Sequence, residues 1–228
     1  MNGKASGASL TSREAPRGSP GAESAVTRRL LACGVSAGPL YMVVGLAQAV
    51  MRDGFDMRRH ALSLLSNGDL GWIQIVNFMA AGALVIAGAL GIRRRLHPGR
   101  GGTWGPILMG LFGVGLIGSG VFVADPGAGF PPGTVPPATM TSSGLLHFVF
   151  GGLGFYALIA AGFVFARRFW SRGERGWAVY SVGTSTGFFA AFAAIASGST
   201  SSAVIVAFYV AVAWVWVWHA SVSARLMR

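Results

Sequence analysis

Six long runs of apolar residues dominate the sequence, separated by short polar stretches. None of these runs contains Asp, Glu, Lys or Arg. Each has about 20 residues, enough for a helix rising about 1.5 Å per residue to cross roughly 30 Å of hydrocarbon. The pattern predicts an all-α integral membrane protein, a bundle of six transmembrane helices within residues 29–221. The six predicted spans are 30–51, 72–92, 104–124, 144–166, 177–197 and 203–221.

The two ends of the chain lie outside these spans. Residues 1–28 are rich in Gly, Ala, Ser and Arg without apolar periodicity, which is typical of a disordered tail, and residues 222–228 form a short C-terminal tail. The first run admits a second interpretation, because Ala47-Gln48-Ala49 near its end is the small-residue pattern of a signal-peptide cleavage site. Its length, with Pro39 mid-way, favours a retained span.

The distribution of charge predicts the orientation. Fifteen of the 18 basic residues and three of the seven acidic residues lie in the N-terminal tail, the 93–103 and 167–176 connections and the C-terminus. The positive-inside rule therefore predicts that both termini are cytoplasmic in a multi-pass protein of the cell membrane. Because the arginines adjoin span ends, membrane lipids and not nucleic acid are the expected partners of the +11 net charge.

Composition agrees with a membrane protein and excludes cysteine-based cross-links and metal clusters. The chain is 53% apolar and 11% charged, which excludes an ordinary water-soluble globule and a disordered chain. A single cysteine, Cys33, excludes an intrachain disulfide framework and a thiolate metal cluster. Six of the seven tryptophans, with His97 and His219, fall near the predicted cytoplasmic interface, where we expect them to meet headgroups and water.

Two glycine-rich motifs match known signatures but lie in the wrong context. Gly113, Gly115 and Gly118 spell G-x-G-x-x-G without the strand or acidic residue that a dinucleotide site requires. Residues 183–187 match G-x-S-x-G within a span, where the strand-to-helix turn of a nucleophile elbow cannot form. Both motifs are better explained by small residues that let helices pack closely.

The connection between the first two spans has helical periodicity. At 100° per residue, residues 55–66 place most of their apolar side chains on one half of a wheel. Asp56, Arg59, His60, Ser63 and Ser66 share the other half. We therefore expect a short interfacial helix at the outer face of the membrane.

Further polar residues are predicted near the same level. Gln74 and Asn77 share one face of the second span, Asp125 ends the third, and His147 lies near the start of the fourth. Unpaired polar groups are costly at this depth, so we expect them to face the bundle interior. They are candidates for one convergent ligand site. The candidate residues are His60, Ser63, Gln74, Asn77, Asp125 and His147.

Several functions fit such a cluster. The first is a protein that binds or transports a small polar ligand or lipid headgroup, although the spans carry no carboxylate for proton coupling. A metal-dependent membrane hydrolase would use His60, Asp125 and His147, but no H-x-x-x-H spacing supports a metal. A scaffold or regulatory subunit is the third. In a purely structural interpretation, Asp125 caps or pairs with His147 to hold the Pro-rich loop 125–143 against the bundle. That loop either covers the pocket or is a plain external loop. No cofactor or oligomeric state is specified, and catalysis is left open.

Four short motifs in this order resemble a prokaryotic multi-pass membrane family, domain of unknown function 998. They are HALS at 60–63, WIQIVNF at 72–78, GVFVADP at 120–126 and GLLH at 144–147. The resemblance covers residues 29–221 and implies six helices, with no substrate, cofactor or reaction. It also implies that the recurring polar positions of the family correspond to His60, Ser63, Asn77, Asp125 and His147.

Overall fold

A computed structural model describes residues 20–228, so residues 1–19 of the predicted tail lie outside the described residues. The described part forms six α-helices and one short 3-10 helix, η1, and all six α-helices are long and apolar enough to cross a membrane. This confirms the predicted six-helix membrane architecture. The elements are α1 (Pro20–Met51), η1 (Leu62–Ser66), α2 (Gly71–Leu96), α3 (Arg100–Val121), α4 (Ser142–Ser171), α5 (Arg175–Ala196) and α6 (Ser202–Leu226).

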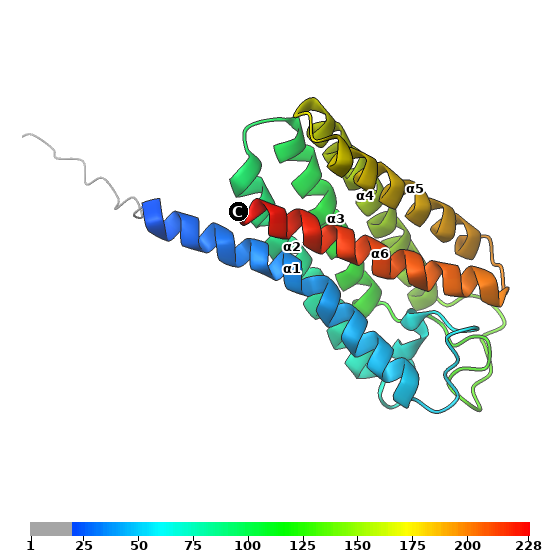
Figure 1. Ribbon diagram of the computed structural model, residues 1–228. Coiled ribbons are helices and arrows are strands. Elements are labelled where there is room, and N and C mark those ends of the chain that lie inside the picture. Colours follow the sequence, from blue (N-terminus) through cyan, green and yellow to red (C-terminus); the bar gives the residue numbers. More distant parts are fainter. Residues whose placement is uncertain (1–19) are drawn as a thin grey trace, which may run out of the picture.

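The helices form a ring in chain order. Each helix packs on the next one along the sequence, and α6 returns to pack on α1 (Figure 1). The ring has two ends. We call the end that holds the 97–99 and 172–174 connections the arginine end, and the end that holds residues 52–70, 122–141 and 197–201 the loop end.

All six α-helices extend beyond the predicted spans at one or both ends, α1 the furthest. α1 begins at Pro20, so residues 20–28, which composition assigned to the tail, are helical, and they project past the neighbouring helices (Figure 1). α6 continues to Leu226, with Val222 and Ser223 fully buried. An apolar run marks only the part of a helix that meets hydrocarbon, whereas backbone hydrogen bonding continues into the aqueous region.

Glycines allow neighbouring helices to approach closely. A Cβ on Gly113 of α3 would lie 2.7 Å from the Gly82 carbonyl oxygen of α2, and a Cβ on Gly115 would lie 2.7 Å from the Gly154 Cα of α4. Ser185 of the second motif occupies the space left by the missing side chain of Gly162. The glycines of the first motif and Ser185 of the second therefore serve helix packing, whereas a Cβ on Gly183 or Gly187 would meet nothing within 4 Å.

The predicted interfacial helix is shorter than expected. Only Leu62–Ser66 is helical, as the 3-10 helix η1. Upstream, the Asp56 carboxylate accepts from the Arg58 amide (2.8 Å) and the His60 ring accepts from the Asp56 amide (2.9 Å), so side chains take the place of helical carbonyl acceptors. The expectation that His60 lies on a polar face is wrong, because its side chain is 2% exposed.

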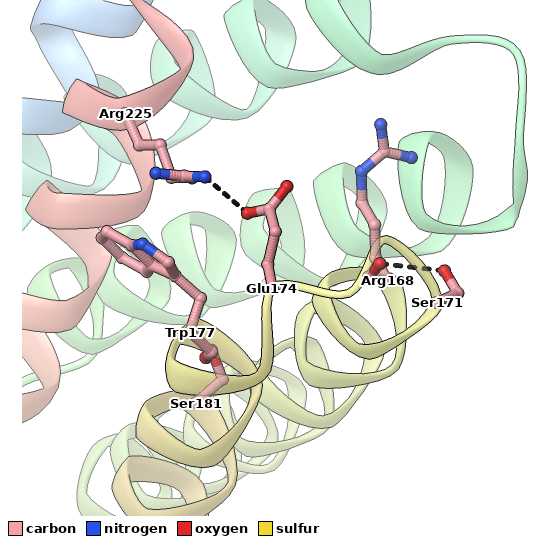
Figure 2. Close-up of polar contacts among 6 residues, drawn as sticks. All are labelled: Arg168, Ser171, Glu174, Trp177, Ser181 and Arg225. Carbon is pink, nitrogen blue, oxygen red and sulfur yellow. Dashed lines mark hydrogen bonds and ion pairs between the residues drawn. The ribbon is translucent and has the colours of Figure 1, made fainter.

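Aromatic and charged side chains join α5 and α6 at the arginine end (Figure 2). Arg225 donates to the Glu174 carboxylate (2.6 Å), and its guanidinium lies 4.9 Å from the Trp177 ring centroid. Deeper in the bundle, the Trp218 indole donates to the Ser181 hydroxyl (3.0 Å). Ser181 in turn donates to the Trp177 carbonyl (2.8 Å).

Three residues expected at the membrane interface are instead buried. Trp216 and Trp218 are 4% and 1% exposed, and His219 is fully buried. The expectation that they meet headgroups and water is therefore wrong. Their positions along the helix suggested the interface, but the rotation of α6 about its axis directs these rings toward α1, α3 and α5.

The ion pair at the arginine end is expected to contribute little to stability. Both side chains are partly exposed, so replacing Glu174 with glutamine should lower the free energy of unfolding by less than about 1 kcal/mol. High salt, at about 1 M, should remove most of that difference. Denaturant titration of micelle-embedded protein measures it. A loss of several kcal/mol that persists in high salt would contradict this assignment.

Candidate functional site

A cavity of about 490 Å³ occupies the loop-end half of the ring. Its walls come from η1 and all six helices, and most of the lining area is apolar. The volume lies within the range of about 300–1,000 Å³ typical of small-molecule pockets. Aromatic rings dominate the wall, including Tyr41, Phe78, Phe112, Phe155, Phe208 and Trp216.

Small residues explain why this half of the bundle is hollow. Gly115, Ser119, Gly151, Gly152 and Gly154 line the cavity where α3 and α4 face the ring interior. The arginine-end half is filled by large buried side chains, chiefly Met109, Phe165 and Trp218. The lining stretch of α4 runs from His147 to Leu158, about 16 Å at about 1.5 Å per residue, so the cavity reaches from the loop end to mid-span.

Phe155 connects three walls of the cavity. Its ring centroid lies 5.1 Å from Phe188 and 5.2 Å from Phe192, both of α5, in edge-to-face geometry. Phe208 of α6 is 6.0 Å away. Such contacts are each worth about 0.5–1.5 kcal/mol beyond the area they bury. They hold α4, α5 and α6 at a separation that leaves the interior open.

His147 is the buried histidine on the wall. Its Nδ1 lies 3.0 Å from the Ser119 carbonyl and 2.9 Å from the Phe122 carbonyl, both at the C-terminal end of α3. Carbonyls only accept, so Nδ1 carries the proton and donates. In the neutral ring, Nε2 is then the acceptor. Nε2 makes no hydrogen bond with any residue between Pro20 and Arg228, and the side chain is 7% exposed.

Other polar groups on the wall are few and uncharged. Tyr41 lines the cavity, and its hydroxyl makes no hydrogen bond with the described residues. Tyr209 also lines it and donates to the His60 carbonyl (2.8 Å). Ser63 of η1 and Ser119 of α3 add aliphatic hydroxyls, and Tyr156 of α4 adds a phenol. None of the described lining residues is Asp, Glu, Lys or Arg.

His60 lies behind the cavity wall and serves the loop end. Its Nδ1 accepts from the Asp56 amide, so Nε2 carries the proton and donates to the Ala128 carbonyl (3.1 Å). The ring packs between Phe55 and Phe130, with centroid distances of 5.2 and 5.5 Å. Both ring nitrogens are thus occupied in holding the 122–141 connection against the segment that precedes η1.

Arg52 is a functional side chain that the sequence did not single out. It donates to the Leu65 carbonyl (2.6 Å) and the Asn67 carbonyl (2.7 Å), and its guanidinium lies 5.0 Å from the Phe130 ring centroid. Partial burial lowers the pKa of Arg52, and the nearby Asp69 carboxylate opposes that shift. Arg52 thereby fixes η1, and with it the end wall of the cavity. In the sequence it resembles any charge that ends a span.

Asp125 closes its own loop. It accepts from the Thr141 amide (2.9 Å) and the Thr141 hydroxyl, joining the two ends of residues 125–141. Thr141 is also the N-cap of α4, where its hydroxyl accepts from the Gly144 amide. The predicted pairing of Asp125 with His147 is not formed, since the His147 ring bonds α3 carbonyls.

Gln74 and Asn77 belong to a buried amide network between α1 and α2. The Gln74 side-chain oxygen accepts from Gln48 (2.9 Å) and Asn77 (3.2 Å), and Asn77 also donates to the Tyr41 carbonyl (3.1 Å). The six candidate residues therefore do not converge. Ser63 and His147 line the cavity, Gln74 and Asn77 join helices, and His60 and Asp125 hold the loop end.

The donor groups are also not arranged for a metal. Within residues 20–228, no group of three or more His, Cys, Asp or Glu side chains is placed to hold an ion. His60 uses both nitrogens and Asp125 uses both carboxylate oxygens in protein contacts. Of the three candidate metal ligands among the described residues, only His147 keeps a donor atom without a protein partner. The sequence does not predict the aromatic wall, because a Phe within an apolar span can face either lipid or the bundle interior.

A protein-family model described as "Protein of unknown function (DUF998)" matches residues 35–225. The chain belongs to the DUF998 family. This confirms the resemblance seen in the four short motifs, and the match takes in the whole cavity of this DUF998 protein. Comparison with curated proteins and with solved structures gave no match.

Proposed function

We propose that this DUF998 protein binds the apolar part of a membrane amphiphile in the loop-end cavity. The observation that carries the proposal is an aromatic cavity of about 490 Å³ whose wall holds an unpaired polar acceptor, His147 Nε2. Pockets with an apolar lining and a few placed polar groups are the usual form of small-molecule sites. The apolar wall supports a lipid chain rather than a small polar metabolite.

The orientation belongs to the same proposal. The arginine end carries most of the basic side chains, so the positive-inside rule places it in the cytoplasm of a cell-membrane protein. The cavity then lies in the outer half of the bilayer. Its amphiphile would come from the outer leaflet, and membrane lipids are the partners.

The loop end supports binding by keeping the end wall in place. Ala61, Leu62 and Ser63 form that wall, and Arg52 and His60 hold the segment around them. Because His60 and Asp125 are committed to these contacts, the hydrolase alternative has no assembled donor set and we do not propose it. A protein that holds its ligand without chemistry fits the wall best.

A cavity-filling variant tests the proposal. A phenylalanine at Gly152 would project into the cavity, since a Cβ there meets only Phe192, at 3.9 Å. The control is Gly110→Phe on α3, where a Cβ meets nothing within 4 Å and which does not line the cavity. Both proteins are equilibrated with phosphatidylethanolamine, phosphatidylglycerol and diacylglycerol, and native mass spectrometry counts the lipid adducts that survive detergent release.

We expect one retained adduct in the wild type and in Gly110→Phe, and about a tenfold loss of occupancy in Gly152→Phe. Equal occupancy in all three proteins would show that lipid binds elsewhere and would overturn the proposal. Complete absence of an adduct would also overturn it and would favour the scaffold alternative.

A further inference from the structure

We infer that the ligand is an uncharged lipid alcohol that enters the cavity from the bilayer through the seam between α4 and α5. This inference rests on the proposed function and names the class of ligand that the same cavity accepts. Two features of the wall carry it. The first is the set of neutral polar groups on the wall, and the second is the place where the wall meets the outer surface of the ring.

The absence of charge on the described wall excludes an ionised headgroup from the cavity interior. Burying an isolated phosphate or carboxylate is strongly unfavourable without a partner of opposite charge. Arg52, the arginine that bonds η1, already donates to two carbonyls and stacks on Phe130. No described lining residue is a free cation. A neutral polar group is what this wall accommodates.

His147 and Tyr41 specify the kind of neutral group. The free Nε2 of His147 is an acceptor, so it requires a donor from the ligand. The unpaired Tyr41 hydroxyl can donate or accept. A hydroxyl suits either group, because it can donate to the His147 acceptor and can accept from Tyr41. An ester or ketone oxygen cannot donate and would leave His147 Nε2 unpaired, which is unfavourable for a buried acceptor.

The cavity wall reaches the outer surface of the ring at mid-span. Tyr156 lines the cavity and is also 55% exposed. It lies fourteen residues after Ser142, about 21 Å along α4 at about 1.5 Å per residue, so in a membrane its exposed surface meets lipid and not water. Phe148, one further lining residue of α4, is 61% exposed.

The seam between α4 and α5 is closed at one end and aromatic at the other. Toward the arginine end, Ser185 fills the space over Gly162, so the two helices are in close contact. Toward the loop end, the rings of Tyr156 and Phe192 meet edge to face with centroids 5.4 Å apart. A chain that passes here would have to separate these two rings. The route therefore leads to bilayer hydrocarbon, where a lipid alcohol resides.

All-trans-retinol and retinoate form a matched pair of probes, since they share one polyene chain and differ in an alcohol against a carboxylate. Trp216 lines the cavity, so energy transfer from tryptophan to the polyene reports binding, with Gly152→Phe protein in nanodiscs as the background. We expect retinol to bind at least about tenfold more tightly than retinoate. His147→Asn retains a donor near the Nδ1 position and lacks the Nε2 acceptor, so it should lose most of this preference.

The outcomes separate the inference from the proposed function. Retinoate binding as tightly as retinol, with both lost in Gly152→Phe, would overturn the lipid-alcohol assignment and leave cavity binding standing. If neither probe binds but a phospholipid adduct is retained in the wild type and lost in Gly152→Phe, the lipid-alcohol assignment is also overturned and cavity binding stands. Failure of both probes together with loss of any adduct would overturn both. A preference for retinol that His147→Asn leaves unchanged would also contradict the assignment.

The lateral route has its own test. Tyr156→Cys/Phe192→Cys protein, in a Cys33→Ser background, is loaded with retinol and then bridged by a short bifunctional thiol reagent. We expect retinol to dissociate at least about tenfold more slowly after bridging, with no change in the two single-cysteine controls. Unchanged dissociation from the bridged protein would overturn passage between α4 and α5.

Discussion

Replacing Gly113 with leucine is expected to lower the free energy of unfolding by about 1–3 kcal/mol or more, because the new side chain has no space between α2 and α3. A Cβ alone would lie 2.7 Å from the Gly82 carbonyl oxygen and 2.7 Å from Ile86. Backbone cannot move aside as a flexible side chain can. The two helices must therefore separate along their whole contact.

Gly110 provides the matched control on the same helix. A Cβ there meets nothing within 4 Å, so Gly110→Leu should change the free energy of unfolding by less than about 0.5 kcal/mol. Leucine has the higher helix propensity, so propensity alone predicts stabilisation at both sites. Denaturant titration in mixed micelles compares the two variants. Equal stability of the two proteins would show that α2 and α3 do not meet at Gly113.

The second large effect is expected at Arg52. Arg52→Lys retains the charge but cannot donate in a planar fork to the Leu65 and Asn67 carbonyls, and it loses the stacking on Phe130. Hydrogen bonds to charged groups contribute about 1.5–3 kcal/mol each, so we expect a loss of about 2–4 kcal/mol. Amide hydrogen exchange at residues 61–67 should increase, since η1 loses its anchor.

Arg58→Lys is the control for this variant. Arg58 is exposed, and the hydrogen bond it makes uses its backbone amide, so the change should be within about 0.5 kcal/mol. Lipid occupancy of the cavity should fall with Arg52→Lys and not with Arg58→Lys, because η1 forms the end wall. Wild-type exchange rates at residues 61–67 in Arg52→Lys would contradict the anchoring role of this side chain.

The sequence predicted the six helices because apolar length is a local property. A run that can cross hydrocarbon is visible without knowing its neighbours. A small residue within such a run is likewise recognisable as a site where helices can pack closely. Boundaries were less accurate at Pro20 and Leu226, where the helices leave hydrocarbon. The polar residues at the loop end were also found, since Asp and His near a span are conspicuous.

The assignment of those polar residues to partners could not be predicted. His60 was placed on a polar face by assuming helical geometry, whereas side-chain hydrogen bonds to Asp56 and Ala128 turned it inward. Asp125 and His147 have complementary side chains, but they do not pair. Asp125 accepts from Thr141, and His147 donates to carbonyls at the end of α3. These choices depend on distances that form only when separate helices meet.

The sequence by itself therefore determined that the chain is a six-helix membrane protein, because hydrophobic length and charge act segment by segment. Only the tertiary structure decided that the loop-end half is hollow and aromatic, with His147 Nε2 free on its wall. Long apolar runs show no sequence periodicity that fixes which side of each helix faces inward. Packing at the glycine contacts sets that rotation, and the rotation places the Phe, Tyr and Trp rings around the cavity.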